Sequence, residues 1–145
     1  MIGLLQRVTQ AKVEIENNAI GKIDQGLMVL VGVERTDNEL KAEKLIDRLI
    51  HYRVFTDQNG KMNENLQQIE GGLLLVPQFT LTADTKKGTR PGFSNGAPPD
   101  LAEKLFLHCV KYAKTRLPIV ESGKFGADML VSLSNDGPVT ITLTT

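Results

Sequence analysis

The segment Pro77-Gln78-Phe79-Thr80 places polar groups directly after the apolar run Leu73–Val76. Proline has no N–H to donate to a sheet, so we expect Pro77 to end a strand. The Gln78 side chain carries an amide donor, and the backbone N–H groups that follow it can be free. Donors that converge near a strand end are the components of an oxyanion hole for acyl transfer. The alternative is a strand bend whose threonines face solvent.

A second unusual segment runs from Asn135 to Thr140 and contains the dipeptide Gly137-Pro138. The dipeptide interrupts a strand-like pattern, Met129–Leu133 before it and Val139–Leu143 after it. Glycine tolerates backbone angles that are closed to other residues, and proline lacks an N–H. The pair therefore presents bare carbonyls and a stiff ring, which suits a surface that recognises shape through its backbone. A tight turn between two strands is the alternative.

The chain shows no obvious side-chain general base and no common catalytic motif of hydrolases, nucleotide-binding proteins or zinc proteases. His51 and His108 fall on expected helices, where a packed or half-exposed histidine is the ordinary interpretation. Cys109 lies on an apolar helix face and should behave as a small buried hydrophobe. Thr80 offers a hydroxyl, but nothing nearby in the sequence would activate it. An enzyme of this kind would act on an already activated substrate.

The composition is that of an ordinary globular protein, with 145 residues, 41% hydrophobic and 23% charged. Seventeen basic residues balance 17 acidic ones, which argues against binding nucleic acid by bulk charge. A local pocket for one end of a nucleic acid remains compatible with this balance. The chain has no apolar run of about 18 residues, no secretory signal pattern and a single cysteine. We therefore expect a cytoplasmic protein without disulfide, metal or cofactor.

The hydrophobic pattern predicts one compact domain over residues 1–145, a mixed layered α/β fold of two β layers with two helices. Thr36 and Glu39 form a capping box that predicts the start of the first helix. Asp100 and Glu103 predict the start of the second helix in the same way, and Pro118 should end that helix. The expected apolar stripe of the first helix is Ala42, Leu45, Ile46, Leu49 and Ile50; that of the second is Leu101, Ala102, Leu105, Phe106, Cys109, Val110 and Ala113. The expected strands are Leu4–Thr9, Lys12–Glu16, Leu27–Val33, Tyr52–Phe55, Leu73–Val76, Met129–Leu133 and Val139–Leu143.

Taken together, Pro77–Asp84 and Asn135–Thr140 resemble the two signature motifs of the D-aminoacyl-tRNA deacylases, S-Q-x-x-T and N-x-G-P-x-T. The segments Gln6–Val8, Lys87–Ser94 and Phe125–Met129 also resemble this family, so the similarity spans essentially the whole chain. The chain departs from the family pattern at one position, because Pro77 stands where the family usually has serine. A serine hydroxyl therefore has no role here.

The resemblance implies hydrolysis of the ester that links a D-amino acid to the terminal adenosine of tRNA. Because glycine has no side chain to exclude, we also expect partial hydrolysis of glycyl-tRNA. The resemblance also implies a homodimer in which the Gly137-Pro138 dipeptide of each subunit, with a cis peptide bond, lies in the other subunit's active site. These residues would exclude L-amino acids. The residues that the resemblance assigns to catalysis are Gln78, Phe79 and Thr80; those it assigns to substrate or adenosine binding are Arg7, Phe125, Met129 and Thr140.

Two mechanisms stay open at this point. In the first, backbone N–H groups near Phe79 and Thr80, with Gln78, hold the carbonyl oxygen while water attacks, helped by the substrate's own 2′-hydroxyl. In the second, Thr80 is the nucleophile. Two other functions also stay open, namely a dimer that binds an aminoacyl or nucleotide ligand without catalysis and a structural dimer without a site. Lys86, Lys87 and Arg90 form a basic cluster that either contacts tRNA phosphates or is a solvated loop face.

Overall fold

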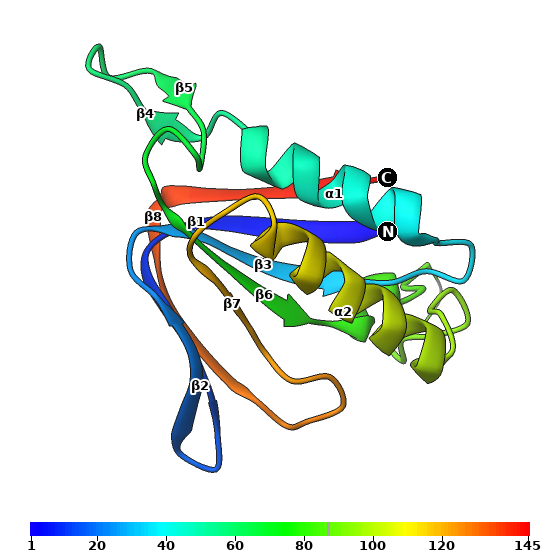
Figure 1. The fold of residues 1–145 in the computed structure, drawn as a ribbon. Coiled ribbons are helices and arrows are strands. Elements are labelled where there is room, and N and C mark those ends of the chain that lie inside the picture. The colour runs from blue at the N-terminus through cyan, green and yellow to red at the C-terminus, as the bar shows by residue number, and fades with distance from the viewer. Residues whose placement is uncertain (87) are drawn as a thin grey trace.

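The computed structural model describes residues 1–86 and 88–145 (Figure 1). The elements of this part are, in chain order, β1 (Ile2–Ile15), β2 (Asn18–Ile23), β3 (Gly26–Gly32), α1 (Glu39–His51), β4 (Phe55–Thr56), β5 (Met62–Glu64), β6 (Gly72–Pro77), the 3₁₀ helix η1 (Phe79–Thr82), α2 (Pro99–Lys114), β7 (Val120–Ser122) and β8 (Leu130–Thr144).

The long strand β1 organises the main sheet. It pairs antiparallel with β3 along its first half, with β2 along its second half, and with β8 on its other side. Strands β3, β6 and β7 run parallel to one another. Parallel neighbours need crossover connections, and α1 and α2 lie in those crossovers on one face of the sheet (Figure 1).

The expected mixed α/β fold with two helices is confirmed, and its β layers come from one strongly bent sheet. Residues of β3 and β6 that face the helices pack with both helices in a large core. On the opposite face, residues of β1, β2, β3 and β6 enclose a smaller core. Strand β2 lies so close to β7 that a Cβ added to Gly21 would stand 3.1 Å from the Ser122 carbonyl oxygen. The sheet therefore closes nearly on itself.

Both predicted helices form, and most residues of their predicted apolar stripes are buried, but each begins at a different residue. Asn38 caps α1, since its side chain accepts a hydrogen bond from the Lys41 N–H at 3.0 Å, so the predicted capping box at Thr36 is wrong. Helix α2 begins at Pro99, because proline suits the first position of a helix, and Asp100 lies inside its first turn.

Three strand predictions need correction. The predicted strand at Tyr52–Phe55 is reduced to Phe55–Thr56, which pairs with β5 in a small hairpin that projects from the main sheet (Figure 1). The two short strands predicted at Leu4–Thr9 and Lys12–Glu16 are one continuous strand, β1. The two predicted around Gly137-Pro138 are also one strand, β8.

The dipeptide Gly137-Pro138 forms a bulge inside β8 rather than a tight turn between strands. Thr140 pairs with Gln6 and Asn135 pairs with Val8, so a five-residue step on β8 matches a two-residue step on β1. The extra residues must leave the plane of the ladder, as bulges do. Within the described part of the chain, no helix is both long and apolar enough to cross a membrane.

Candidate active site

The first motif lies at the carboxyl ends of the parallel strands, the edge at which α/β sheets commonly bind ligands. Strand β6 ends at Pro77, and the sheet geometry explains why proline fits there. The Leu73 N–H donates to the carbonyl of Ile119, just before β7, at 3.0 Å, and the Leu75 carbonyl accepts from the N–H of Gly123, just after β7, at 2.8 Å. Because backbone groups alternate in direction along a strand, Pro77 faces the same side beyond the end of β7. Its missing N–H therefore interrupts no ladder bond.

Phe79 and Thr80 supply two backbone donors that are free within the part of the chain that the structure describes. The first hydrogen bond of the turn runs from the Leu81 N–H to the Gln78 carbonyl at 3.3 Å, so the two preceding N–H groups have no partner in the helix. Within residues 1–86 and 88–145, neither group has any other hydrogen-bond partner. The Gln78 N–H is not available, because it donates to the Val31 carbonyl at 2.8 Å. The structure thus narrows the predicted backbone donors to two.

The side chains of the turn support its shape. The Gln78 amide donates to the Thr80 hydroxyl, and an amide cannot act as a base toward that hydroxyl. The Thr82 hydroxyl donates to the Phe79 carbonyl at 2.8 Å, and Thr82 is buried. The sequence did not single out Thr82, whose position beside Gly96 depends on a loop far along the chain. The turn is therefore held in place from both ends.

Met129 packs against the end of β6. A Cβ added to Gly123 would lie 2.8 Å from Met129 Sδ and 3.2 Å from Pro77 Cδ, so the Met129 and Pro77 side chains both pack closely against Gly123. The Lys124 N–H points to Met129 Sδ at 3.3 Å. Phe125 follows in the same loop and is partly buried against the large core. The predicted adenosine contacts Phe125 and Met129 thus belong to the loop that borders the donor turn.

The second motif stands at the opposite end of the parallel strands. Arg7 on β1 pairs with Leu27 at the start of β3, whereas Pro77 pairs with Val31 near its end. Four residues along the strands span about 13 Å, and the three strand spacings from β8 to β6 add about 14 Å across the sheet. The Gly137-Pro138 bulge of one chain is therefore remote from the donor turn of the same chain.

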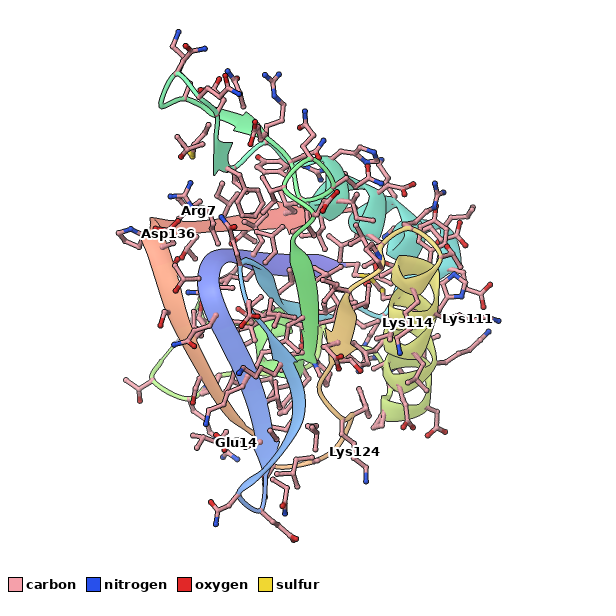
Figure 2. All side chains as sticks on the ribbon, turned by 60° about the vertical axis from the view of Figure 1, so that its left-hand side comes forward. Arg7, Glu14, Lys111, Lys114, Lys124 and Asp136 are labelled. Carbon is pink, nitrogen blue, oxygen red and sulfur yellow. The ribbon has the colours of Figure 1, made fainter. Side chains whose placement is uncertain are left out.

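Arg7 fixes the base of this bulge. Its guanidinium donates from Nη1 to the Val54 carbonyl at 2.5 Å and from Nε to the Asp136 carbonyl at 3.3 Å. Nε also lies 3.0 Å from Asp136 Oδ2, and Figure 2 shows the two residues together near the bend of β8. Arg7 is buried, while Asp136, Gly137 and Pro138 are exposed. A buried cation thus anchors an exposed protrusion.

Asn135 and Thr140 close the bulge from its two ends. Asn135 Nδ2 donates to Thr140 Oγ1 at 2.8 Å, and Asn135 Oδ1 accepts from the Val139 N–H at 3.2 Å. Gly137 has a φ of +113°, and the Gly137–Pro138 peptide bond is cis, as the resemblance implied. No role for Asn135 or Asp136 was predicted from the sequence, although both lie in the segment Asn135–Thr140.

The remaining candidate side chains lie elsewhere. His108 Nε2 is 2.9 Å from Glu43 Oε1 between the two helices, and His51 Nδ1 is 2.8 Å from the Asp47 carbonyl. Cys109 is fully buried, and burial raises the pKa of its thiol to about 12.

Of the basic loop cluster, Lys86 and Arg90 are exposed, and Lys87 lies outside the described residues.

The sequence and the fold of this chain match those of known proteins. Residues 4–144 match the family described as D-Tyr-tRNA(Tyr) deacylase. A D-aminoacyl-tRNA deacylase of Pseudoalteromonas atlantica is 57% identical over 143 residues, which are 99% of either chain. A solved structure described as c-Myc DNA Unwinding Element Binding Protein is 33% identical with a TM-score of 0.95, over 100% of this chain and 99% of the other.

A second solved structure, described as a probable eukaryotic D-amino acid tRNA deacylase, has a TM-score of 0.86 over 99% of this chain and 98% of the other. At 17% identity, this likeness shows the shared fold alone. The match over residues 4–144 and the 57% identity to a bacterial relative carry the family assignment. The chain belongs to the D-Tyr-tRNA(Tyr) deacylase family.

Proposed function

We propose that the protein hydrolyses the ester bond of D-aminoacyl-tRNA and releases free D-amino acid and tRNA. The observation that carries this proposal is the pair of N–H groups on Phe79 and Thr80, which have no partner among the described residues and lie at the sheet edge where α/β folds commonly bind ligands. Each well-placed oxyanion donor is worth roughly 2.7–4 kcal/mol. Family membership supports the choice of substrate.

The proposed reaction needs no side-chain nucleophile, because an aminoacyl ester is already reactive in water. The two N–H groups hold the carbonyl oxygen as negative charge develops on it, and a water oxygen forms a bond to the carbonyl carbon. The bond from that carbon to the ribose oxygen then breaks. The proton lost by water passes to the leaving ribose oxygen by way of the neighbouring 2′-hydroxyl of the substrate. Orientation of this water contributes further to the rate.

We propose that two copies of the chain build each site. The exposed Gly137-Pro138 bulge of one copy would lie in the cleft beside Phe79 and Thr80 of the other. The separation of the two motifs within one chain favours this arrangement. Strand β8 favours it as well, because its outer edge has no partner strand among the described residues. An unpaired edge of this length is normally covered in the working assembly.

The same arrangement would select the hand of the substrate. The carbonyls of Gly137 and Pro138 would occupy the space into which an L side chain projects, so L-amino acids collide with the backbone. Glycine has no side chain to exclude, and glycyl-tRNA should be hydrolysed in part. Phe125 and Met129 would contact the terminal adenosine. We also propose a cytoplasmic location for the enzyme.

The direct test follows ester loss from D-tyrosyl-, L-tyrosyl- and glycyl-tRNA over time. We expect fast hydrolysis of the D ester, measurable hydrolysis of the glycyl ester and none of the L ester above the spontaneous rate. Equal rates for the D and L esters contradict the proposed selection by Gly137 and Pro138. Binding of all three without release of amino acid indicates the alternative function, a non-catalytic aminoacyl-binding dimer.

A further inference from the structure

Two aromatic rings stand exposed beside the donor turn. The side chain of Phe79 is 61% exposed and that of Phe93 is 42% exposed. Their ring centroids are 5.1 Å apart, and the ring planes meet at 61°. Single exposed apolar residues are common, but two contacting aromatic rings in solvent form a patch that marks a binding surface.

The backbone around Phe93 is held in place. Gly92 and Asp84 exchange two hydrogen bonds, at 2.7 and 3.0 Å, and the Gly96 N–H donates to the Phe93 carbonyl at 3.2 Å. The other ring belongs to Phe79, whose own N–H is a proposed oxyanion donor. The aromatic pair is therefore preorganised and lies one side-chain length from the proposed place of the reacting ester.

The charge of the surrounding loop favours a nucleic acid. Residues 85–99 contain three basic residues and no acidic one. Of these, Lys86 and Arg90 are exposed, and neither has an ion pair within the residues that the structure describes. Aromatic rings that accompany free cations are the surface on which unpaired bases stack while phosphates contact the charges. A second copy of this near-neutral chain offers no such match to a basic loop.

We infer that Phe93, together with the ring of Phe79, binds an unpaired nucleobase next to the terminal adenosine in the single-stranded 3′ end of the tRNA. This inference rests on the proposed function. The terminal adenosine itself is assigned to Phe125 and Met129, which lie in the loop after β7. The ring pair belongs to the turn after β6 and to the loop before α2. A strand of RNA can therefore contact both surfaces with successive bases.

Two substrates with the same D-tyrosyl ester distinguish binding of a neighbouring base from catalysis. D-tyrosyl-tRNA carries the neighbouring bases, whereas D-tyrosyl-adenosine lacks them. The Phe93→Ala variant should lose roughly tenfold in kcat/KM toward the tRNA, in keeping with the loss of one stacked base. It should retain wild-type kcat/KM toward the nucleoside ester, and Phe93→Tyr should restore the tRNA reaction. The matched control is Leu107→Ala, another large exposed apolar residue, on α2.

A binding measurement keeps the inference testable apart from hydrolysis. A short single-stranded RNA with the tRNA 3′ sequence should bind Phe93→Ala roughly tenfold more weakly than wild type, as followed by fluorescence anisotropy. Unchanged binding together with unchanged kcat/KM overturns the inference, as does an equal loss on both substrates. A change in the oligomeric state of Phe93→Ala overturns the inference too, because the ring would then belong to an interface between copies. Failure of wild type to hydrolyse either ester, with RNA binding still sensitive to Phe93, rejects the proposed function alone.

Discussion

Arg7 binds Asp136 across 129 positions of sequence, through a 3.0 Å ion pair to Oδ2 and a 3.3 Å hydrogen bond to the backbone carbonyl (Figure 2). The same guanidinium also donates to the Val54 carbonyl. Three acceptors from two separate segments therefore depend on the planar fork of one buried side chain. Lysine offers a point charge instead of this fork and cannot reproduce the geometry.

Arg7→Lys should leave the protein folded but loosen the Gly137-Pro138 bulge. We expect hydrolysis of D-tyrosyl-tRNA to fall on the order of tenfold, because the proposed cleft depends on a fixed bulge. The control is Arg53→Lys, which breaks a similar fork from Nε and Nη2 to Asn63 in the hairpin. Equal activity of the two variants in a deacylation assay argues against a role for Arg7 in positioning the bulge.

Gly137→Ala tests the backbone of the bulge itself. Gly137 has a φ of +113°, and an added Cβ would stand 2.9 Å from Arg7 Nη2. We expect a loss of about 1–3 kcal/mol in the free energy of unfolding, from a conformation that L residues rarely adopt. Deacylation should be lost as well. Gly60→Ala is the control, because Gly60 has a φ of +77° with nothing within 4 Å of an added Cβ. It should destabilise without changing turnover.

The free N–H of Phe79 can be removed with little damage to the turn, since proline suits the first position of a helix. Phe79→Pro should lower kcat by about a hundredfold or more, the usual consequence of losing one oxyanion donor. Phe79→Leu removes the ring but keeps the N–H, so the difference between the two variants measures the donor. Similar kcat values for both would show that this N–H holds no developing charge.

Thr80→Ala separates the two mechanisms. Its hydroxyl accepts a hydrogen bond from the Gln78 amide, and no base among the described residues contacts it. We expect turnover within about tenfold of wild type, since only the orientation of that amide changes. Abolished turnover in a folded Thr80→Ala variant, with rescue by Thr80→Ser, would make the threonine the nucleophile.

Cys109 should take no part in the reaction. Burial raises the pKa of its thiol to about 12, so the thiol stays protonated at neutral pH. Iodoacetamide should label Cys109 in the unfolded chain but leave the native protein unlabelled and active. Cys109→Ala should keep full kcat while losing on the order of 1 kcal/mol of stability from the core. Rapid labelling of the native protein would place the thiol in contact with solvent.

The sequence predicted the helices and the buried strands because burial imposes a periodic pattern on the residues themselves. Their starting points were wrong where local chemistry decided between neighbours, as Asn38 did at α1 and Pro99 at α2. Strand β8 could not be predicted as continuous. Its continuity through Gly137-Pro138 depends on pairing with Gln6 and Val8, which are distant in sequence.

The candidate site shows the same division between local and distant causes. Pro77 predicted a strand end, and in the structure β6 does end there, so the N–H groups of Phe79 and Thr80 follow at the carboxyl edge of the parallel strands. The loss of the Gln78 N–H to Val31 could not be foreseen, because Val31 belongs to another strand. The distance between the two motifs within one chain also depends on the order of the strands in the sheet, which could not be predicted from a single sequence.

A mixed dimer tests the shared site most directly. Phe79→Pro removes one oxyanion donor and Gly137→Ala damages the bulge, so each pure variant should lose nearly all of its activity. The two variants carry different affinity tags and are produced together, and the species with both tags is purified. One of its two sites then combines an intact donor turn with an intact bulge, and we predict about half of wild-type D-tyrosyl-tRNA hydrolysis. Complete inactivity of this mixed species, with both chains folded and associated, would contradict a site built from two copies.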